Sequence, residues 1–162
     1  MDAGPEGAVA IVAVGAANAF NLLVVAVMST RMSTRLRGDR RLESAWGVAD
    51  AAILLVLAAC VAAAAASGAP WWAVALPLPL AAYLVVEILL DQVLRSDFRR
   101  TRLLWPYLLL FYAGQFAMIG YAFLVGRPAG FLTLATYFAS LLATWVSYRS
   151  VGHGPGPAGR AV

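Results

Sequence analysis

The sequence EILLDQVLRSDFR, residues 87–99, decides the fold, because an apolar run long enough to cross a bilayer ends here in a series of charges. Glu87, Asp91, Arg95 and Arg99 follow one another at intervals of four residues. On an α-helix they lie along one face, with the acids N-terminal to the bases, which is the favourable order. The spacing predicts one continuous helix that leads from lipid to water.

The composition is typical of an integral membrane protein. Of the 162 residues, 62% are hydrophobic and 12% are charged, whereas about a quarter of an ordinary soluble domain is charged. A chain of this length is too short for a second domain, so we predict a single transmembrane domain over residues 1–150. The start of the chain is acidic where a secretory signal is basic, which predicts that the first apolar segment is retained.

Five apolar segments each approach the length of about 20 residues that a membrane-spanning helix needs. The predicted fold class is therefore all-α, a five-helix transmembrane bundle. After residue 150 the chain is rich in Gly and Pro, and we expect residues 151–162 to form a disordered tail. The spans are predicted at residues 8–28, 46–66, 71–94, 103–125 and 131–148.

The arginines predict how the chain is oriented. Nine of them lie in two polar stretches, residues 29–44 and 95–102, and one lies in the connection at 126–130. The positive-inside rule assigns the arginine-rich connections to the cytoplasm, so we expect the N-terminus outside, the C-terminus in the cytoplasm, and a location in the cell inner membrane. Anionic lipid headgroups are the expected partners at this face, and no nucleic acid is expected.

Polar residues inside two of the spans predict which helix faces meet. Asn18 and Asn21 share one face of the first span, and an amide in lipid needs a partner, so this face is expected to point into the bundle. Hydroxyl side chains line one face of the last span and can bond back to their own backbone. These hydroxyl residues are Thr133, Thr136, Ser140 and Thr144.

Small and rigid residues predict local features of the helices. Pro77 and Pro79 should kink or locally unwind the third span, since each removes a backbone donor. The alanine-rich residues 58–66 are expected to press against neighbouring helices, and Gly114 and Gly120 are expected to mark close helix crossings.

The ends of the spans carry further signals. We predict a tight turn at residues 126–130 and an interfacial aromatic position for Tyr107. Cys60, the one cysteine, is interpreted as a small core residue, and His153, the one histidine, has no partner that would make a metal site.

The predicted topology brings polar side chains to one depth in the cytoplasmic half. Asp50 and Glu87 each lie about one helical turn inside this face. Asn21, Ser140 and Thr144 fall in the same half, which predicts a cytoplasm-facing polar pocket, because charged groups at such depth normally face a bundle interior or a water-filled cavity.

A purely structural interpretation of the same residues stays open. Glu87 and Asp91 can satisfy arginines along their own helix, Asp50 can pair with an arginine of the first connection, and the amides can hold helices together.

Three classes of function fit the pocket. In the first, Asp50 and Glu87 bind or pass a proton, a cation or a small ligand. In the second, the chain binds or modifies a lipid: Asp50, Glu87 and Asp91 hold a divalent cation while arginines hold a phosphate or diphosphate headgroup. The third is a non-catalytic structural or assembly subunit, as a self-associating chain or with a partner membrane subunit. The arginines of the second class are Arg40, Arg41, Arg99 and Arg102.

An enzyme stays open but is not favoured by the sequence. The chain has no activated serine or cysteine with a partner histidine and no glycine-rich phosphate loop. We therefore expect no catalytic residues, no resident metal and no cofactor, and we prefer the first class of function.

Overall fold

The computed structural model describes residues 5–33, 40–94 and 102–150, and all regular structure within them is helical. Five helical stretches are long and apolar enough to span a membrane: Gly7–Thr30, Ala45–Ala66, Trp71–Ile88, Leu104–Val125 and Arg127–Ser147. The predicted all-α bundle with five candidate spans is confirmed at this level. The complete elements are α1 (Pro5–Ser33), α2 (Arg40–Ala66), α3 (Trp71–Ala75), α4 (Leu78–Ile88), the π-helical η1 (Leu89–Val93), α5 (Leu104–Val125) and α6 (Arg127–Ser150).

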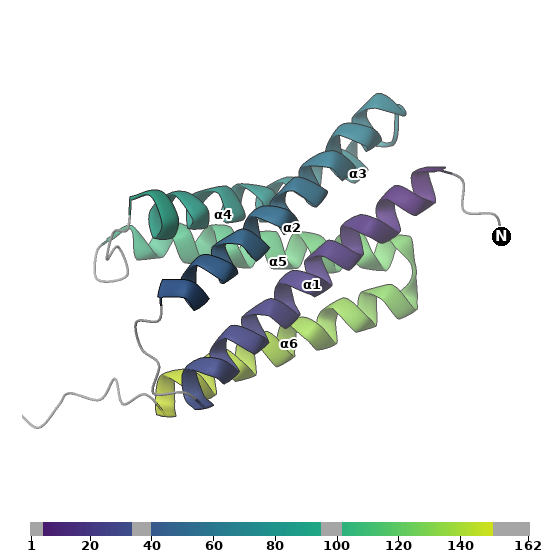
Figure 1. Ribbon diagram of the computed structural model, residues 1–162. Coiled ribbons are helices and arrows are strands. Elements are labelled where there is room, and N and C mark those ends of the chain that lie inside the picture. The colour runs from purple at the N-terminus through teal and green to yellow at the C-terminus, as the bar shows by residue number, and fades with distance from the viewer. Residues whose placement is uncertain (1–4, 34–39, 95–101, 151–162) are drawn as a thin grey trace, which may run out of the picture.

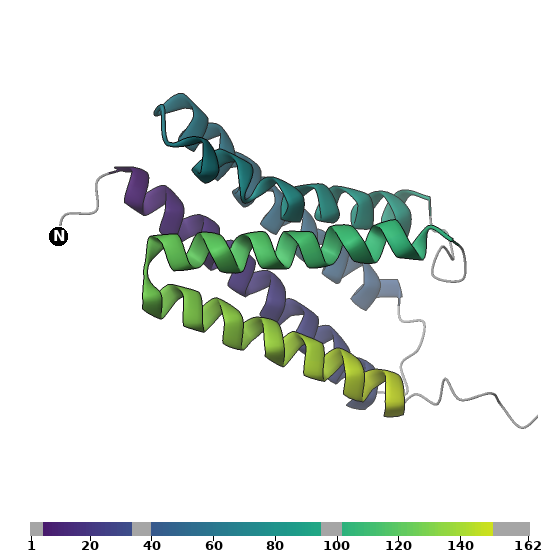
Figure 2. The same ribbon diagram turned by 180° about the vertical axis from the view of Figure 1, so that it is seen from behind.

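The helices run up and down between two ends of the bundle (Figures 1 and 2). The first turns of α1, the α2–α3 turn and the α5–α6 turn lie at one end, on the right in Figure 1. The start of α2, the end of η1, the start of α5 and the end of α6 lie at the other. Helix α1 packs mainly against α6 and α2, while α5 packs against α4 on one side and α6 on the other.

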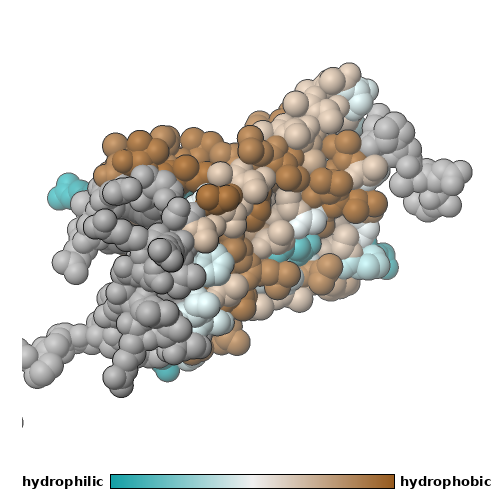
Figure 3. Space-filling view, in the orientation of Figure 1, coloured by the Kyte–Doolittle hydropathy of each residue, from teal (hydrophilic) through white to brown (hydrophobic). Residues whose placement is uncertain are grey.

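Apolar side chains fill the interior and also cover the outside. Phe20, Leu57, Leu80, Leu84 and Met118 are buried and bring together α1, α2, α4 and α5. Large apolar residues also project outward, and Figure 3 shows them over much of one face of the bundle. Soluble monomers rarely expose a contiguous apolar surface of this extent, so the surface suggests a membrane protein.

The third span is broken at the prolines, as the sequence predicts. Helix α3 ends at Ala75, and α4 begins at Leu78 with Pro77 preceding it. The backbone carbonyl of Pro77 accepts the N–H of Ala81, so the new helix starts at once. Pro79 lies in the first turn of α4, where its missing N–H costs no hydrogen bond.

The prediction of a continuous α-helix through the charged series is wrong from Leu89 onward. Residues Leu89–Val93 form a π-helical turn, and the N–H of Leu94 donates to the carbonyl of Leu89 at 2.8 Å. A five-residue hydrogen-bond step replaces the four-residue step of the α-helix, so the backbone from Leu89 to Val93 does not continue the α-helical register of α4. Arg95 and Arg99 lie outside the described residues.

The connections at the other end of the bundle are short. Helix α2 ends in a Schellman motif: Gly68 has φ +71°, its N–H donates to the carbonyl of Ala65, and the N–H of Ala69 donates to that of Ala64. The turn predicted at residues 126–130 is wrong in extent, because only Gly126 stands between the helices and α6 begins at Arg127. A proline as the second residue suits the first turn of a helix.

Two glycines predicted at helix crossings behave differently. A Cβ atom at Gly114 would lie 2.9 Å from the Cα atom of Leu80, so α4 and α5 cross in direct backbone contact. Gly120 faces open space, and its prediction as a crossing point is wrong. A third glycine, Gly130, makes room for a side chain rather than for a helix backbone, because a Cβ there would overlap the Phe123 ring.

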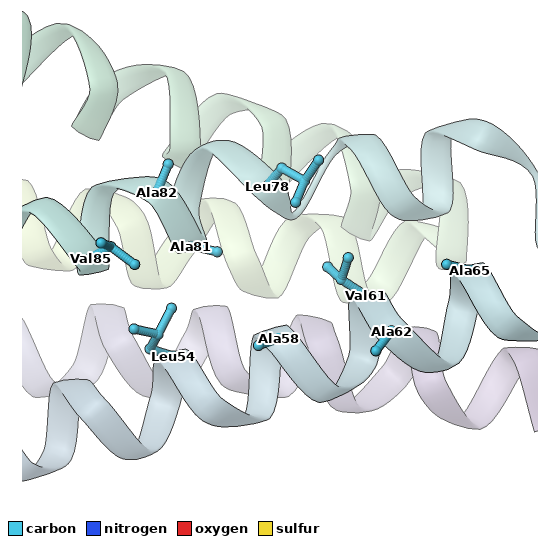
Figure 4. A pocket seen from close by; sticks show the side chains of 9 residues that line it. All are labelled: Leu54, Ala58, Val61, Ala62, Ala65, Leu78, Ala81, Ala82 and Val85. Carbon is cyan, nitrogen blue, oxygen red and sulfur yellow. The ribbon is translucent and has the colours of Figure 1, made fainter.

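The alanine-rich half of α2 is packed along one face only. Cys60 and Ala64 are buried, whereas most of residues 58–66 are exposed, so the prediction that neighbouring helices cover this half is wrong for its outer face. Between α2 and α4 this face forms an apolar groove of about 510 Å³ (Figure 4). The groove is lined by Leu54, Ala58, Val61, Ala62, Ala65, Leu78, Ala81, Ala82 and Val85.

The helices extend beyond the predicted apolar spans at several ends. Helix α1 continues to Ser33 and α2 starts at Arg40, because arginine and glutamate support a helix as well as apolar residues do. The tail predicted to be disordered, residues 151–162, lies outside the described residues.

Candidate functional site

Glu87 lies in the last turn of α4, on the buried face of that helix. Tyr83 stands one turn earlier and Leu84 three residues earlier, and both are buried. Because residues three and four apart share a helix face, the half-buried Glu87 side chain continues this interior face toward the end of the bundle.

Two tyrosines connect Glu87 to the interior. The hydroxyl of Tyr107, on α5, donates to Oε1 of Glu87 at 3.3 Å, and the hydroxyls of Tyr83 and Tyr107 are 2.7 Å apart. A phenol has one hydrogen to donate. When Tyr107 gives its hydrogen to Glu87, the hydrogen bond between the two phenols is donated by Tyr83. The Tyr83 hydroxyl is also within hydrogen-bond reach of Glu87 itself, one turn along α4.

Aromatic rings fix the inner end of this hydrogen-bonded chain. The ring of Tyr83 is 5.8 Å from that of Phe20 on α1, 5.2 Å from Phe111 and 5.1 Å from Tyr107, both on α5. The contacts with the two phenylalanines are edge-to-face, a geometry that aromatic pairs prefer. Tyr83 is only 4% exposed, so its hydroxyl is held in place by three helices.

The backbone next to the site is irregular. Glu87 is followed after one residue by η1, the π-helical turn at Leu89–Val93. Such turns are rare and occur frequently at functional sites. The carboxylate therefore lies between a rigid aromatic cluster and an unusual helical segment.

Asp50, the second predicted acid, lies on α2 and is half-buried. It precedes the fully buried Leu57 by seven residues, two helical turns, so the two residues share a face of α2. That Asp50 and Glu87 line one common binding pocket stays a prediction.

The amides of α1 meet the hydroxyls of α6 in a buried polar seam. Nδ2 of Asn18 donates to Thr133 at 3.1 Å, and Oδ1 of Asn18 accepts from Thr136 at 2.7 Å. Nδ2 of Asn21, which is 0% exposed, donates to Thr136 at 3.2 Å. The prediction that this face of α1 points into the bundle is confirmed.

Ser140 and Thr144 are satisfied within α6. The hydroxyl of Ser140 donates to the carbonyl of Tyr137 at 2.7 Å, and that of Thr144 donates to the carbonyl of Ser140 at 2.8 Å. The predicted bonding of these hydroxyls to their own backbone is confirmed. Asn21 belongs to the α1–α6 seam, and no hydrogen bond described for these three residues joins them to Glu87.

Most of the remaining predicted residues lie where the structure describes no side chain. Asp91 belongs to η1 and Arg40 and Arg41 begin α2, and only their backbones are described. Arg99 is outside the described residues, whereas Arg102 is exposed just before α5. Among the described residues, no three His, Cys, Asp or Glu side chains form a group that could hold a metal ion.

The sequence analysis missed both tyrosines of the Glu87 chain. Tyr107 was predicted as an interfacial aromatic, and its contact with Glu87 joins helices that no local pattern relates. Tyr83 carried a usable signal, since a phenol four residues before a buried acid lies on the same helix face.

Comparison with known proteins adds no relative: no family model matches the sequence, and no curated protein or solved structure matches it significantly. The fold therefore defines the class as far as it can be stated, an all-helical bundle with five helices that are long and apolar enough to span a membrane.

Proposed function

We propose that the protein is a multi-pass protein of the cytoplasmic membrane, with its N-terminus outside and its C-terminus in the cytoplasm. The arginines at the end of α1, the start of α2 and the start of α5 support this orientation, because these three helix ends lie at the same end of the bundle (Figure 1). They are Arg31, Arg40, Arg41 and Arg102. The α5–α6 turn at the opposite end carries Arg127 alone.

Within this orientation, Glu87 is a cytoplasm-facing site that binds or passes a proton, a small cation or another small ligand. The chain from Tyr83 through Tyr107 to Glu87 carries this proposal. A carboxylate in an apolar bundle is costly to keep charged and is normally retained for function. Two phenols in series let a change at the carboxylate be passed inward by a switch of hydrogen-bond direction.

Transport by the reconstituted full chain tests this function. Liposomes containing pyranine report proton entry, and ²²Na⁺ uptake reports cation entry under an imposed potential. Either or both fluxes are expected to exceed those of protein-free liposomes. Glu87→Gln should abolish the flux, because it removes the ionisable group while keeping its size. Tyr107→Phe should reduce it, because Glu87 and Tyr83 both lose the Tyr107 hydroxyl as a hydrogen-bond partner.

A matched control is available on the same helix. Tyr112 is 40% exposed and contacts Phe111 through its ring. Tyr112→Phe therefore removes a hydroxyl from α5 and leaves the hydrogen bonds among Tyr83, Tyr107 and Glu87 in place. This variant should keep the wild-type flux. Absence of both fluxes in wild type, or equal flux in Glu87→Gln, contradicts the proposal.

The alternative is a structural or assembly subunit, and the apolar groove between α2 and α4 favours it. Small residues permit close approach of another helix in a membrane. Purification in a mild detergent separates the two functions: a stoichiometric partner span, with unchanged assembly in Glu87→Gln, supports the subunit. A second alternative is that the protein binds lipid headgroups through the exposed Arg102 just before α5. Anionic lipid that co-purifies with wild type and is lost in Arg102→Ala would support it.

A further inference from the structure

A second cavity lies at the end of the bundle away from Glu87. It has a volume of about 260 Å³ and is enclosed by the first turns of α1, the α2–α3 turn, α3 and the last turns of α5. Tyr121 lines it, and fourteen residues of α5 separate Tyr121 from Tyr107, a distance of about 21 Å along the helix. The cavity is therefore distinct from the site at Glu87.

The wall of this cavity is apolar and contains an aromatic pair. The rings of Trp72 and Tyr121 lie 5.9 Å apart, and small aliphatic residues such as Ala10, Ala64 and Ala73 form much of the remaining surface. No acidic or basic side chain is among the described residues that line it. An uncharged occupant fits such a wall, since an unpaired charge would be costly there.

Two hydroxyl groups give the cavity a polar side. Tyr121 is only 2% exposed, and its hydroxyl makes no hydrogen bond to any described residue. Ser67 donates its hydrogen to the carbonyl of Ala64 at 3.0 Å, which leaves the lone pairs of its oxygen able to accept. The Tyr121 oxygen is not among the buried described atoms that lack a partner, so it is accessible and can donate a hydrogen bond to an occupant of the cavity.

We propose that this cavity binds a small uncharged ring-shaped molecule that carries a carbonyl or hydroxyl oxygen. The ring packs against Trp72, and its oxygen accepts a hydrogen bond from Tyr121. The volume is slightly below the about 300–1,000 Å³ of pockets for drug-sized ligands, which restricts the occupant to about one ring. The proposal does not depend on the function of Glu87.

Tryptophan quenching by duroquinone, a neutral ring with two carbonyl acceptors, tests the proposal on the full chain in nanodiscs. Trp72 lines the cavity, whereas the adjacent Trp71 is 78% exposed and does not. Wild type and Trp71→Phe should show saturable quenching. Trp72→Phe should lose the saturable part, because the reporter that stacks on the ring is gone.

The hydrogen bond is tested separately. Tyr121→Phe keeps the ring and should raise the Kd for duroquinone about 2–10-fold, the effect of losing one ordinary hydrogen bond. The melting temperature of each variant, measured with a thiol-reactive dye at the buried Cys60, verifies that it is folded. Quenching that rises linearly without saturation in wild type, saturable quenching retained in Trp72→Phe, or an unchanged Kd in Tyr121→Phe would each overturn the proposal.

Discussion

Replacing Gly114 by alanine should force α4 and α5 apart. The added Cβ would lie 2.9 Å from the Cα atom and 3.0 Å from the backbone nitrogen of Leu80. Ordinary contacts begin at 3.4 Å, so the helices must separate by about 0.5 Å, the difference between 3.4 and 2.9 Å. The atoms in the way belong to backbone, which cannot move aside as a flexible side chain can.

A second glycine on α5 isolates the packing cost. Alanine at Gly120 would meet nothing within 4 Å, so Gly120→Ala should gain only the higher helix propensity of alanine, about 0.5–1 kcal/mol. Gly114→Ala gains the same propensity and also overpacks the crossing, which costs about 1–3 kcal/mol. The difference between the two variants is therefore the packing cost alone, about 1–3 kcal/mol.

Thermal unfolding in detergent measures this difference. Cys60 is the one cysteine in the chain and is 7% exposed, so a thiol-reactive dye becomes fluorescent as the bundle opens. For a chain of this size, 1 kcal/mol shifts the Tm by about 2–4 °C, and Gly114→Ala should melt about 2–12 °C below Gly120→Ala. Equal melting temperatures would refute a direct backbone contact at Gly114.

Three further substitutions probe the packing with the same assay. Asn18→Leu should lower the free energy of unfolding by about 1–3 kcal/mol, because it removes hydrogen bonds to two threonines of α6, each worth about 0.6–2 kcal/mol in a membrane. A variant as stable as wild type, or more stable, would contradict a stabilising polar seam. Gly130→Ala should destabilise the protein by about 1–3 kcal/mol, because the added methyl group overlaps the Phe123 ring. Adding Phe123→Leu to this variant should restore part of the lost stability. No recovery in the double variant would argue against this contact. Gly68→Ala should cost about 1–2 kcal/mol because of its positive φ, and Gly68→Asn should cost less; equal losses would count against a left-handed turn.

The number and approximate length of the five apolar helices could be predicted because hydrophobic length is a local property. The helix break at Pro77 and the inward face of Asn18 and Asn21 followed from single residues and from helical periodicity. Each of these inferences needs only the residues of one helix. The structure agrees with them for that reason.

The contacts between helices could not be predicted in the same way. The hydrogen bond from Tyr107 to Glu87 depends on how α4 and α5 cross, and that crossing depends on the close approach at Gly114. Gly114 and Gly120 look alike in sequence, yet only the first meets a neighbour. The π-helical turn after Ile88 also has no signal in the spacing of the charges, which favours a regular α-helix.

The hydrogen bonds that the α6 threonines can make within their own helix affect the order in which the bundle assembles. The hydroxyls of Thr133 and Thr136 can each donate to a carbonyl of α6, and Nδ2 of Asn18 donates to the carbonyl of Val14 in α1. In the bundle the single hydrogen of Thr136 goes either to this carbonyl or to Oδ1 of Asn18. These polar groups are thus hydrogen-bonded before the two helices meet, which lowers the penalty for transferring either helix alone into hydrocarbon. If the helices insert into a membrane as proposed, we therefore expect α1, made first, to be stable there as an independent segment until α6 is synthesised and packs beside it.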